Sequence, residues 1–221
     1  MTTVLCADPD EAVAGVGDGS TVLVGGFGMA GMPVALIDAL IRQGATDLTV
    51  VSNNAGNGDT GLAALLAAGR VRKVVCSFPR QADSWVFDGL YRQGRVELEL
   101  VPQGTLAERM RAAGAGIGAF YCPTGVGTPL AEGKETREID GRSHVLEYPL
   151  RGDVALIGAY RADRMGNLVY RKTARNFGPV MATAATTVVA QVREVVDVGA
   201  LDPEAVVTPG IYVDRVVEVT S

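Results

Sequence analysis

Histidine, cysteine and aromatic residues are scarce in this 221-residue sequence. There is one histidine, there are three cysteines, and aromatic residues make up 5% of the chain. A Ser-His-Asp or Cys-His hydrolase would have to use His144, which we predict to be a solvated loop histidine of a hairpin, and the sequence has no GxSxG motif to pair with it. Cys6, Cys76 and Cys122 are widely spaced, which is typical of reduced thiols in a cytoplasm and argues against a structural zinc site. Cys76 and Cys122 lie in apolar, strand-like segments and are expected to be buried, inert thiols.

Long apolar runs and basic runs are absent too. The longest apolar stretches, such as Leu62–Ala68, are far shorter than the ~20 residues of a membrane-spanning helix. The N-terminus has no basic start followed by an apolar core, so no signal peptide is expected. The net charge is −5 and no segment is rich in Lys or Arg, which argues against nucleic acid as a partner. We therefore expect a cytoplasmic protein that binds neither membranes nor nucleic acid, and no metal-ligand spacing is seen.

The residues that are present describe an ordinary globular protein. Hydrophobic residues make up 48% of the chain and charged residues 20%. The length suits one domain, and no composition break or flexible linker divides the chain. Residues 1–221 are therefore expected to form a single domain.

Short apolar runs alternate with helical patterns in the first half of the chain. This alternation is typical of right-handed βαβ units and predicts an α/β protein with a mostly parallel sheet. The expected strands are Val22–Val24, Leu48–Val51, Val74–Phe78 and Val96–Val101, and the expected helices are Val34–Arg42, Leu62–Ala68 and Ser84–Arg92.

Local signals add further elements. Asp8-Pro9 predicts the start of a first helix, and Thr105-Leu-Ala-Glu108 is typical of a capping box for a helix that runs to Ala113. In the second half, Asp140-Gly141-Arg142 predicts a hairpin turn. The strands expected there are Arg137–Ile139, Ser143–Tyr148, Val154–Tyr160, Thr187–Val192 and Ile211–Val219.

The segment Thr21–Pro33, TVLVGGFGMAGMP, predicts a strand, a glycine-rich loop and the start of a helix. Such a loop lets a ligand approach the backbone and presents N–H groups at the positive end of the helix. The spacing Gly26-x-Gly28-x-x-Gly31 matches GxGxxG, but a dinucleotide site also needs an acidic residue at the end of the next strand. Asp47 lies before that strand and Asp59 well past it, so the pattern argues against NAD or FAD. The alternative interpretation of this glycine-rich loop is a tight turn that binds no ligand.

The carboxylates of the sequence offer no obvious nucleophile. Glu97 and Glu99 alternate with apolar residues and are expected on a solvated strand face, while Glu108 is assigned to the capping box. The charged stretch that holds Glu132, Glu135 and Glu138 is expected to be exposed.

Amide side chains follow two of the expected strands, as Asn53-Asn54 and as Gln103. In a parallel sheet these positions meet at the carboxyl edge beside the glycine loop, where ligands bind. Amides and loop N–H groups can hold a carbonyl or carboxylate oxygen, but they cannot attack one. The sequence therefore predicts half of an active site.

Six sequence blocks occur in order along the chain: DGSTVLVGGFGMAGMP (Asp18–Pro33), SNNAG (Ser52–Gly56), PQGTLAER (Pro102–Arg109), PTG (Pro123–Gly125), ADRMGN (Ala162–Asn167) and RKTARNF (Arg171–Phe177). With these blocks the chain resembles the A (alpha) subunit of the class I 3-oxoacid CoA-transferases, from about Asp8 to Val217. Within that family, CSFPRQ (Cys76–Gln81) and GKETREIDGR (Gly133–Arg142) resemble the 3-oxoadipate (β-ketoadipate) CoA-transferases. Acetoacetate-preferring relatives usually carry a tyrosine-glycine-glutamate-type segment after the same strand.

The resemblance implies a fold and a reaction. The family fold is a three-layer α/β/α sheet. The reaction is a ping-pong transfer of CoA from succinyl-CoA to 3-oxoadipate in the β-ketoadipate pathway of aromatic breakdown. Its nucleophile is a glutamate of the B subunit, which forms an acyl anhydride and then a glutamyl-CoA thioester. The implied assembly is an A2B2 heterotetramer with CoA mainly on the B chain, and no cofactor is implied because the CoA thioester is a substrate.

By motif match, the resemblance also gives roles to individual residues. Gln103 would contact the substrate carbonyl or carboxylate, and Asn53 and Asn54 would help to line the same pocket. The glycine loop, with Gly25, Gly26, Phe27, Gly28 and Gly31, would pack close to the acyl group and the glutamate. Arg80 is expected in a loop at the carboxyl edge, where its guanidinium could grip the second carboxylate of 3-oxoadipate. A surface arginine without a ligand is the alternative.

Other functions stay open on the sequence alone. The substrate could be acetoacetate rather than 3-oxoadipate. A non-catalytic sugar-phosphate or regulator-binding domain of the same fold would keep the glycine loop but would not need Gln103 or Asn53-Asn54. An NAD-dependent enzyme would use GxGxxG but would lack its ribose-binding acid.

Overall fold

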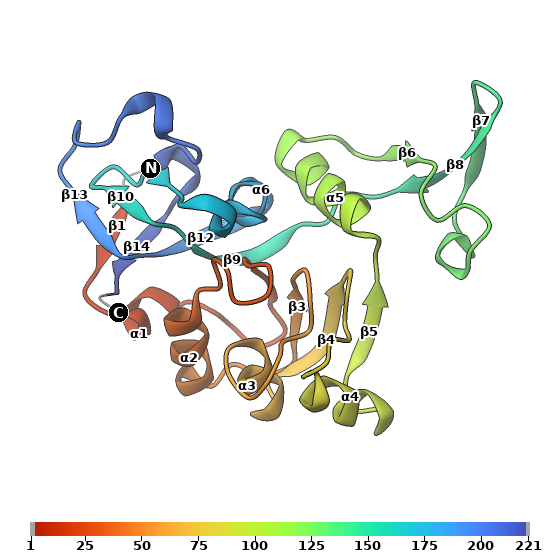
Figure 1. The fold of residues 1–221 in the computed structure, drawn as a ribbon, viewed down its shortest axis with the longest axis horizontal. Helices are drawn as coiled ribbons and strands as arrows, with labels where there is room; N and C mark the ends of the chain where they lie inside the picture. Colours follow the sequence, from red (N-terminus) through yellow and green to blue (C-terminus); the bar gives the residue numbers. More distant parts are fainter. Residues whose placement is uncertain (1–2, 220–221) are drawn as a thin grey trace.

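The computed structural model describes residues 3–219, and its centre is an eight-stranded sheet (Figure 1). The strand order is β1-β14-β12-β9-β2-β3-β4-β5, and every neighbouring pair is parallel. The predicted parallel sheet is confirmed. Its strands are β1 (Val4–Cys6), β2 (Thr21–Val24), β3 (Leu48–Val51), β4 (Val71–Cys76), β5 (Glu97–Leu100), β9 (Gly152–Gly158), β12 (Ala185–Val192) and β14 (Arg215–Glu218).

Helices cover both faces of this sheet (Figure 1). One face carries α1 (Pro9–Val13), α2 (Val34–Gln43), α3 (Leu62–Ala67) and α4 (Trp85–Arg92), and the other carries α5 (Gln103–Ala115) and α6 (Gly178–Ala184). Because side chains alternate along a strand, Val22 and Val24 pack into the first core and Leu23 into the second. The strands are apolar on both faces because both faces are covered. The three-layer α/β/α arrangement is thus confirmed.

The residues predicted to begin and end the helices of the first half do so in the structure. The Asp8 side chain accepts a hydrogen bond from the Glu11 N–H at 2.8 Å, and Pro9 occupies the first position of α1. The helix α2 follows Pro33 directly and ends at Gly44 in the left-handed conformation. The ends of the four strands and three helices predicted in the first half of the chain agree with the observed ends to within three residues.

The predicted capping box at Thr105 is wrong. The helix α5 begins at Gln103, because the carbonyl of Pro102 already accepts the N–H of Leu106 at 2.8 Å. Thr105 therefore lies buried inside the helix with its hydroxyl 4.0 Å from the Cys122 sulfur, and Glu108 pairs with Arg111 at 2.7 Å. The helix also runs two residues beyond Ala113.

An antiparallel sheet, which we call the arm (residues 120–147), projects from the body between α5 and β9 (Figure 1). It consists of β6 (Phe120–Cys122), β7 (Thr136–Ile139) and β8 (Arg142–Glu147), with a short 3₁₀ helix at Pro129–Ala131. The predicted hairpin is confirmed as β7–β8. The predicted loop position of His144 is wrong, because His144 lies half-buried within β8.

The third sheet of the protein is small and has three strands. It contains β10 (Arg161–Asp163), β11 (Leu168–Val169) and β13 (Glu194–Val196), and 3₁₀ helices occur at Lys172–Arg175, Pro203–Ala205 and Gly210–Tyr212. The last of these replaces the first part of the predicted strand Ile211–Val219, of which only Arg215–Glu218 is a strand. Within residues 3–219, no helix is both long enough and apolar enough to cross a membrane.

Candidate active site

The carboxyl ends of four neighbouring strands bring the candidate residues to one edge of the sheet. The glycine loop follows β2, Asn53 follows β3, Arg80 follows β4 and Gln103 follows β5. On the other side of β2 lies β9, so the chain order in the sheet reverses direction between these two strands. Ligands of open parallel sheets bind at such a switch point.

The glycine loop is a small, tightly packed hairpin. Phe27 and Ala30 exchange backbone hydrogen bonds of 3.0 and 3.2 Å, which leaves the side chains of Phe27 and Met29 exposed at the tip. A Cβ on Gly31 would lie 2.3 Å from the Ala174 carbonyl oxygen, and a Cβ on Gly158 would lie 2.6 Å from the Gly31 carbonyl oxygen. Side chains at these two positions would push the loop out of place.

Two side chains from distant parts of the sequence hold the glycine loop and the helix behind it. The Asn176 Oδ1 accepts the Gly26 N–H at 3.1 Å, and its Nδ2 donates to the Ala30 carbonyl at 2.8 Å. The Gln191 Oε1 accepts the N–H groups of Ala35 and Leu36, in the first turn of α2, at 3.1 and 3.3 Å. The sequence analysis missed both roles, although Asn176 belongs to the RKTARNF block.

Asn53 and Gln103 are brought together as predicted. The Gln103 Nε2 donates to the Asn53 Oδ1 at 2.7 Å, and the Ser77 hydroxyl donates to the same oxygen at 2.8 Å. Asn53 is buried, whereas the Gln103 side chain reaches solvent. An amide nitrogen carries two hydrogens, so Gln103 keeps one N–H for a ligand while Asn53 fixes its orientation.

Asn54 and Arg80 are not part of this pair. The Asn54 Oδ1 accepts the Gly56 N–H at 2.8 Å and so closes a local turn, and Asn54 lines a small cavity together with Leu62 and Leu66 of α3. Arg80 lies in the loop after β4 as predicted, but its Nε is 3.0 Å from the Asp88 Oδ1 of α4. Their roles in substrate binding remain predictions.

Glu99 is not on a solvated strand face, which corrects the prediction made for it. Its carboxylate is half-buried and pairs with Lys73 at 2.6 Å and with Arg109 at 3.0 Å. Burial raises the pKa of the Glu99 carboxyl, but the hydrogen bonds and charges of Lys73 and Arg109 outweigh burial, so its pKa is lowered. Glu97, by contrast, is exposed as predicted.

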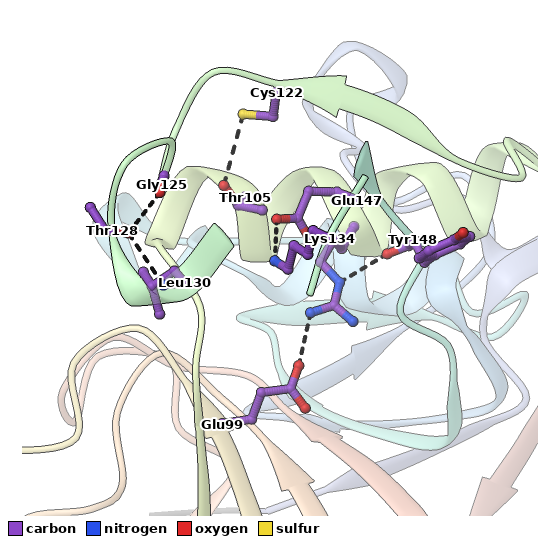
Figure 2. Close-up of polar contacts among 10 residues, drawn as sticks. Glu99, Thr105, Cys122, Gly125, Thr128, Leu130, Lys134, Glu147 and Tyr148 are labelled. Carbon is purple, nitrogen blue, oxygen red and sulfur yellow. Dashed lines mark hydrogen bonds and ion pairs between the residues drawn. The ribbon is translucent and has the colours of Figure 1, made fainter. Parts of the chain in front are cut away.

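Arg109 also holds the segment that follows the arm, since it donates to the Tyr148 carbonyl at 2.9 Å (Figure 2). Within the arm itself, Lys134 pairs with the buried Glu147 at 2.5 Å. Glu99 therefore serves a structural ion pair rather than the chemistry at the carboxyl edge.

The described residues place no activated nucleophile at this edge. Cys76 is fully buried, and burial raises the pKa of its thiol to about 12, so it is an inert thiol as predicted. His144 lies in the arm, and its Nδ1 is 2.7 Å from the Arg142 carbonyl oxygen. Across residues 3–219, no three His, Cys, Asp or Glu side chains are grouped closely enough to hold a metal ion.

Fold and site together define a class of protein. It is a three-layer α/β protein with amide side chains and a glycine loop at the carboxyl edge of its parallel sheet. The chain belongs to the coenzyme A transferase family, whose model matches residues 6–219.

Named relatives agree with this assignment. The chain is 70% identical, over 95% of its length and 91% of the relative's, to the A subunit of 3-oxoadipate CoA-transferase from Pseudomonas putida. It is 55% identical, over 96% of its length and 87% of the relative's, to the A subunit of succinyl-CoA:3-ketoacid coenzyme A transferase from Xanthomonas campestris (strain B100). Their names imply that these relatives work with a second, different chain.

A solved structure shows the same fold in a longer chain. An acyl-CoA transferase from E. coli O157:H7, in a thioester complex with CoA, superposes with a TM-score of 0.87 at 25% identity. The match covers 99% of this chain and 50% of that chain, so this chain spans half the length of that transferase.

Proposed function

We propose that this chain is the A subunit of a 3-oxoadipate CoA-transferase, which moves CoA from succinyl-CoA to 3-oxoadipate in aromatic catabolism. The observation that carries the proposal is the higher identity to the 3-oxoadipate enzyme, 70% against 55% for the 3-ketoacid enzyme. Residues 1–221 act in it as one CoA-transferase A domain. We place the enzyme in the cytoplasm, which the three free cysteines support.

In this proposal a B subunit supplies the nucleophile, and the two chains assemble as A2B2. A B-chain glutamate attacks the thioester carbonyl of succinyl-CoA, and the CoA thiolate leaves as the anhydride forms. The thiolate then attacks the glutamyl carbonyl of the anhydride and releases succinate, which leaves a glutamyl-CoA thioester. Attack by the 3-oxoadipate carboxylate displaces CoA to give a second anhydride, and return of the thiolate to the 3-oxoadipyl carbonyl regenerates the glutamate.

The A chain contributes orientation and charge stabilisation to these steps. Negative charge develops on the carbonyl oxygen each time a nucleophile adds to it. The free N–H of Gln103, held in place by Asn53, is the donor that we assign to this oxygen. The glycine loop forms the wall next to the acyl group, and its hydrogen bonds to Asn176 fix it before substrate arrives.

A second candidate is transfer to acetoacetate, and the ion pair of Arg80 favours it. An arginine engaged by Asp88 is less available to the second carboxylate that distinguishes 3-oxoadipate from acetoacetate. The test is to produce the chain together with a B subunit, and to compare kcat/KM for the two acids with succinyl-CoA as donor. A preference for 3-oxoadipate supports the first proposal, and a preference for acetoacetate supports the second. No transfer with either acid would favour a non-catalytic binding domain.

A further inference from the structure

The side chain of Ser77 lies against the amide pair of Asn53 and Gln103. Ser77 follows β4 directly, and β4 lies between β3, which leads to Asn53, and β5, which leads to Gln103. Its hydroxyl oxygen is 2.8 Å from the Asn53 Oδ1 and 3.1 Å from the Asn53 backbone carbonyl oxygen. Ser77 is half-buried, and nothing in the capping or turn chemistry of its own segment requires a hydroxyl there.

The backbone bonds of Asn53 decide which oxygen receives the single hydrogen of the Ser77 hydroxyl. The Asn53 carbonyl oxygen already accepts the N–H of Ser77 at 3.2 Å and that of Phe78 at 3.0 Å. A carbonyl oxygen has two lone pairs, so both are occupied. The hydroxyl therefore donates to the Asn53 Oδ1, whose other lone pair accepts the Gln103 Nε2 at 2.7 Å.

This donation fixes the direction of both amides. A side-chain amide can turn by about 180°, which exchanges its oxygen and its nitrogen. If Asn53 turned, its Nδ2 would face Gln103, and the Gln103 amide would turn as well so that its Oε1 could accept. The bond between the two amides survives in either arrangement and so selects neither. The Ser77 hydroxyl selects the observed one, because its hydrogen needs an oxygen and the Asn53 Oδ1 is the acceptor at hand.

We propose that Ser77 is a positioning residue of the acyl site, whose hydroxyl sets the direction of the Asn53 amide and, through it, of the Gln103 donor. The inference rests on the proposed function, in which the free N–H of Gln103 meets the oxygen that gains charge. Such a donor stabilises a transition state most when its direction is fixed before the substrate arrives. A pair of amides free to turn together would hold the Gln103 nitrogen in place for only part of the time.

Kinetics of the complex of the two chains test the consequence for transfer. Ser77→Ala should lower kcat by about 3- to 10-fold and leave KM for succinyl-CoA within about 2-fold, because one neutral hydrogen bond that orients the donor is lost. Ser77→Thr keeps the hydroxyl and should restore kcat. In a Gln103→Ala background, Ser77→Ala should change kcat by less than about 2-fold, since its effect passes through Gln103.

The matched control is Ser20→Ala. Ser20 is also half-buried and precedes β2 at the opposite edge of the sheet, where its hydroxyl donates to the Gly17 carbonyl at 2.7 Å. This variant should keep its kcat. An equal loss of kcat from Ser77→Ala with and without Gln103, or no loss in either background, overturns the proposal.

Nuclear magnetic resonance of the full chain, labelled with ¹⁵N in its asparagine and glutamine side chains, tests the positioning without any transfer. The unmodified chain, Ser77→Thr and Ser20→Ala should each give one sharp Gln103 side-chain signal. Ser77→Ala should give a broadened or second signal, because the amide then occupies both directions. One sharp Gln103 signal at an unchanged position in Ser77→Ala overturns the proposal. A complex without transferase activity would contradict the proposed function instead, and this spectrum would still show whether Ser77 orients the amides.

Discussion

At the scale of single residues, the amide of Gln103 is the group on which the proposed chemistry depends most. If its free N–H donates to the oxygen that gains charge during acyl transfer, Gln103→Ala should lower kcat by roughly 10²–10³. Steady-state kinetics of the variant with a B subunit, beside a thermal melt, measure this effect.

The matched control is Gln93→Ala, an exposed glutamine at the end of α4 whose side chain makes no hydrogen bond within residues 3–219. That variant should keep its turnover and its melting temperature. A Gln103 variant that melts earlier but turns over normally would show that the amide only stabilises the start of α5.

Arg80 is the residue that we assign to the second carboxylate of 3-oxoadipate. A hydrogen bond to a charged group is worth about 1.5–3 kcal/mol, so Arg80→Ala should lower kcat/KM for 3-oxoadipate by roughly 10–150-fold. Turnover of acetoacetate should change little. Succinate, also a dicarboxylate, could be affected alongside.

A substitution of Asp88, the ion-pair partner of Arg80, gives a second test of substrate preference. Because Asp88 holds Arg80 at 3.0 Å, Asp88→Asn should leave the guanidinium freer and raise the preference for 3-oxoadipate over acetoacetate. Equal losses on both acids in Arg80→Ala, or no change in preference in Asp88→Asn, would remove Arg80 from substrate recognition.

At the scale of elements, the glycine loop depends on one side chain. Asn176→Ala removes two hydrogen bonds to the loop, which should lower the free energy of unfolding by about 1–3 kcal/mol. It should also lower kcat/KM of the folded remainder, because the loop wall is no longer fixed.

Asn167→Ala is the control for this loop variant, since Asn167 bonds to Asp163 at 2.8 Å and to the Gly210 N–H at 2.9 Å in the β10–β11 region. Its loss should reduce stability with turnover of the folded protein intact. Identical kinetic effects in the two variants would mean that Asn176 acts through stability alone.

The ion pairs that Glu99 forms with Lys73 and Arg109 predict a pH effect. The pKa of Glu99 is lowered on folding, so its ion pairs stabilise the protein fully above its ordinary pKa of 4.5 and are lost as the pH falls through the folded value. Glu99→Gln should therefore lower the melting temperature at about pH 6, and the difference from the unmodified chain should shrink towards about pH 3. Melting curves across this range test the effect, with the exposed Glu97→Gln as control.

Elements that depend on local sequence could be predicted, and those set by distant contacts could not. Buried parallel strands are apolar on both faces, which is why Val22–Val24 and Leu48–Val51 were visible as runs. The Thr105 capping box failed because Pro102, placed by the end of β5, already starts the helix. The partners of Glu99 belong to a neighbouring strand and to α5, and no local pattern indicated them.

At the scale of the whole molecule, strand order assembles the candidate site. Asn53 and Gln103 are 50 residues apart and meet because β3, β4 and β5 are neighbours in a parallel sheet. That meeting could be predicted from the alternation of strands and helices. The Asn176 contact with the glycine loop spans 150 residues and crosses from one half of the sheet to the other, so the sequence pattern alone did not show it.

The central claim is that this chain forms half of a CoA-transferase site. The most direct measurement is CoA transfer from succinyl-CoA to 3-oxoadipate by the purified chain alone, by its B partner alone and by the two together. The account predicts transfer only in the mixture, because the A chain orients the acyl group and the B chain attacks it. Robust transfer by this chain alone, or none by the assembled pair, would contradict the account.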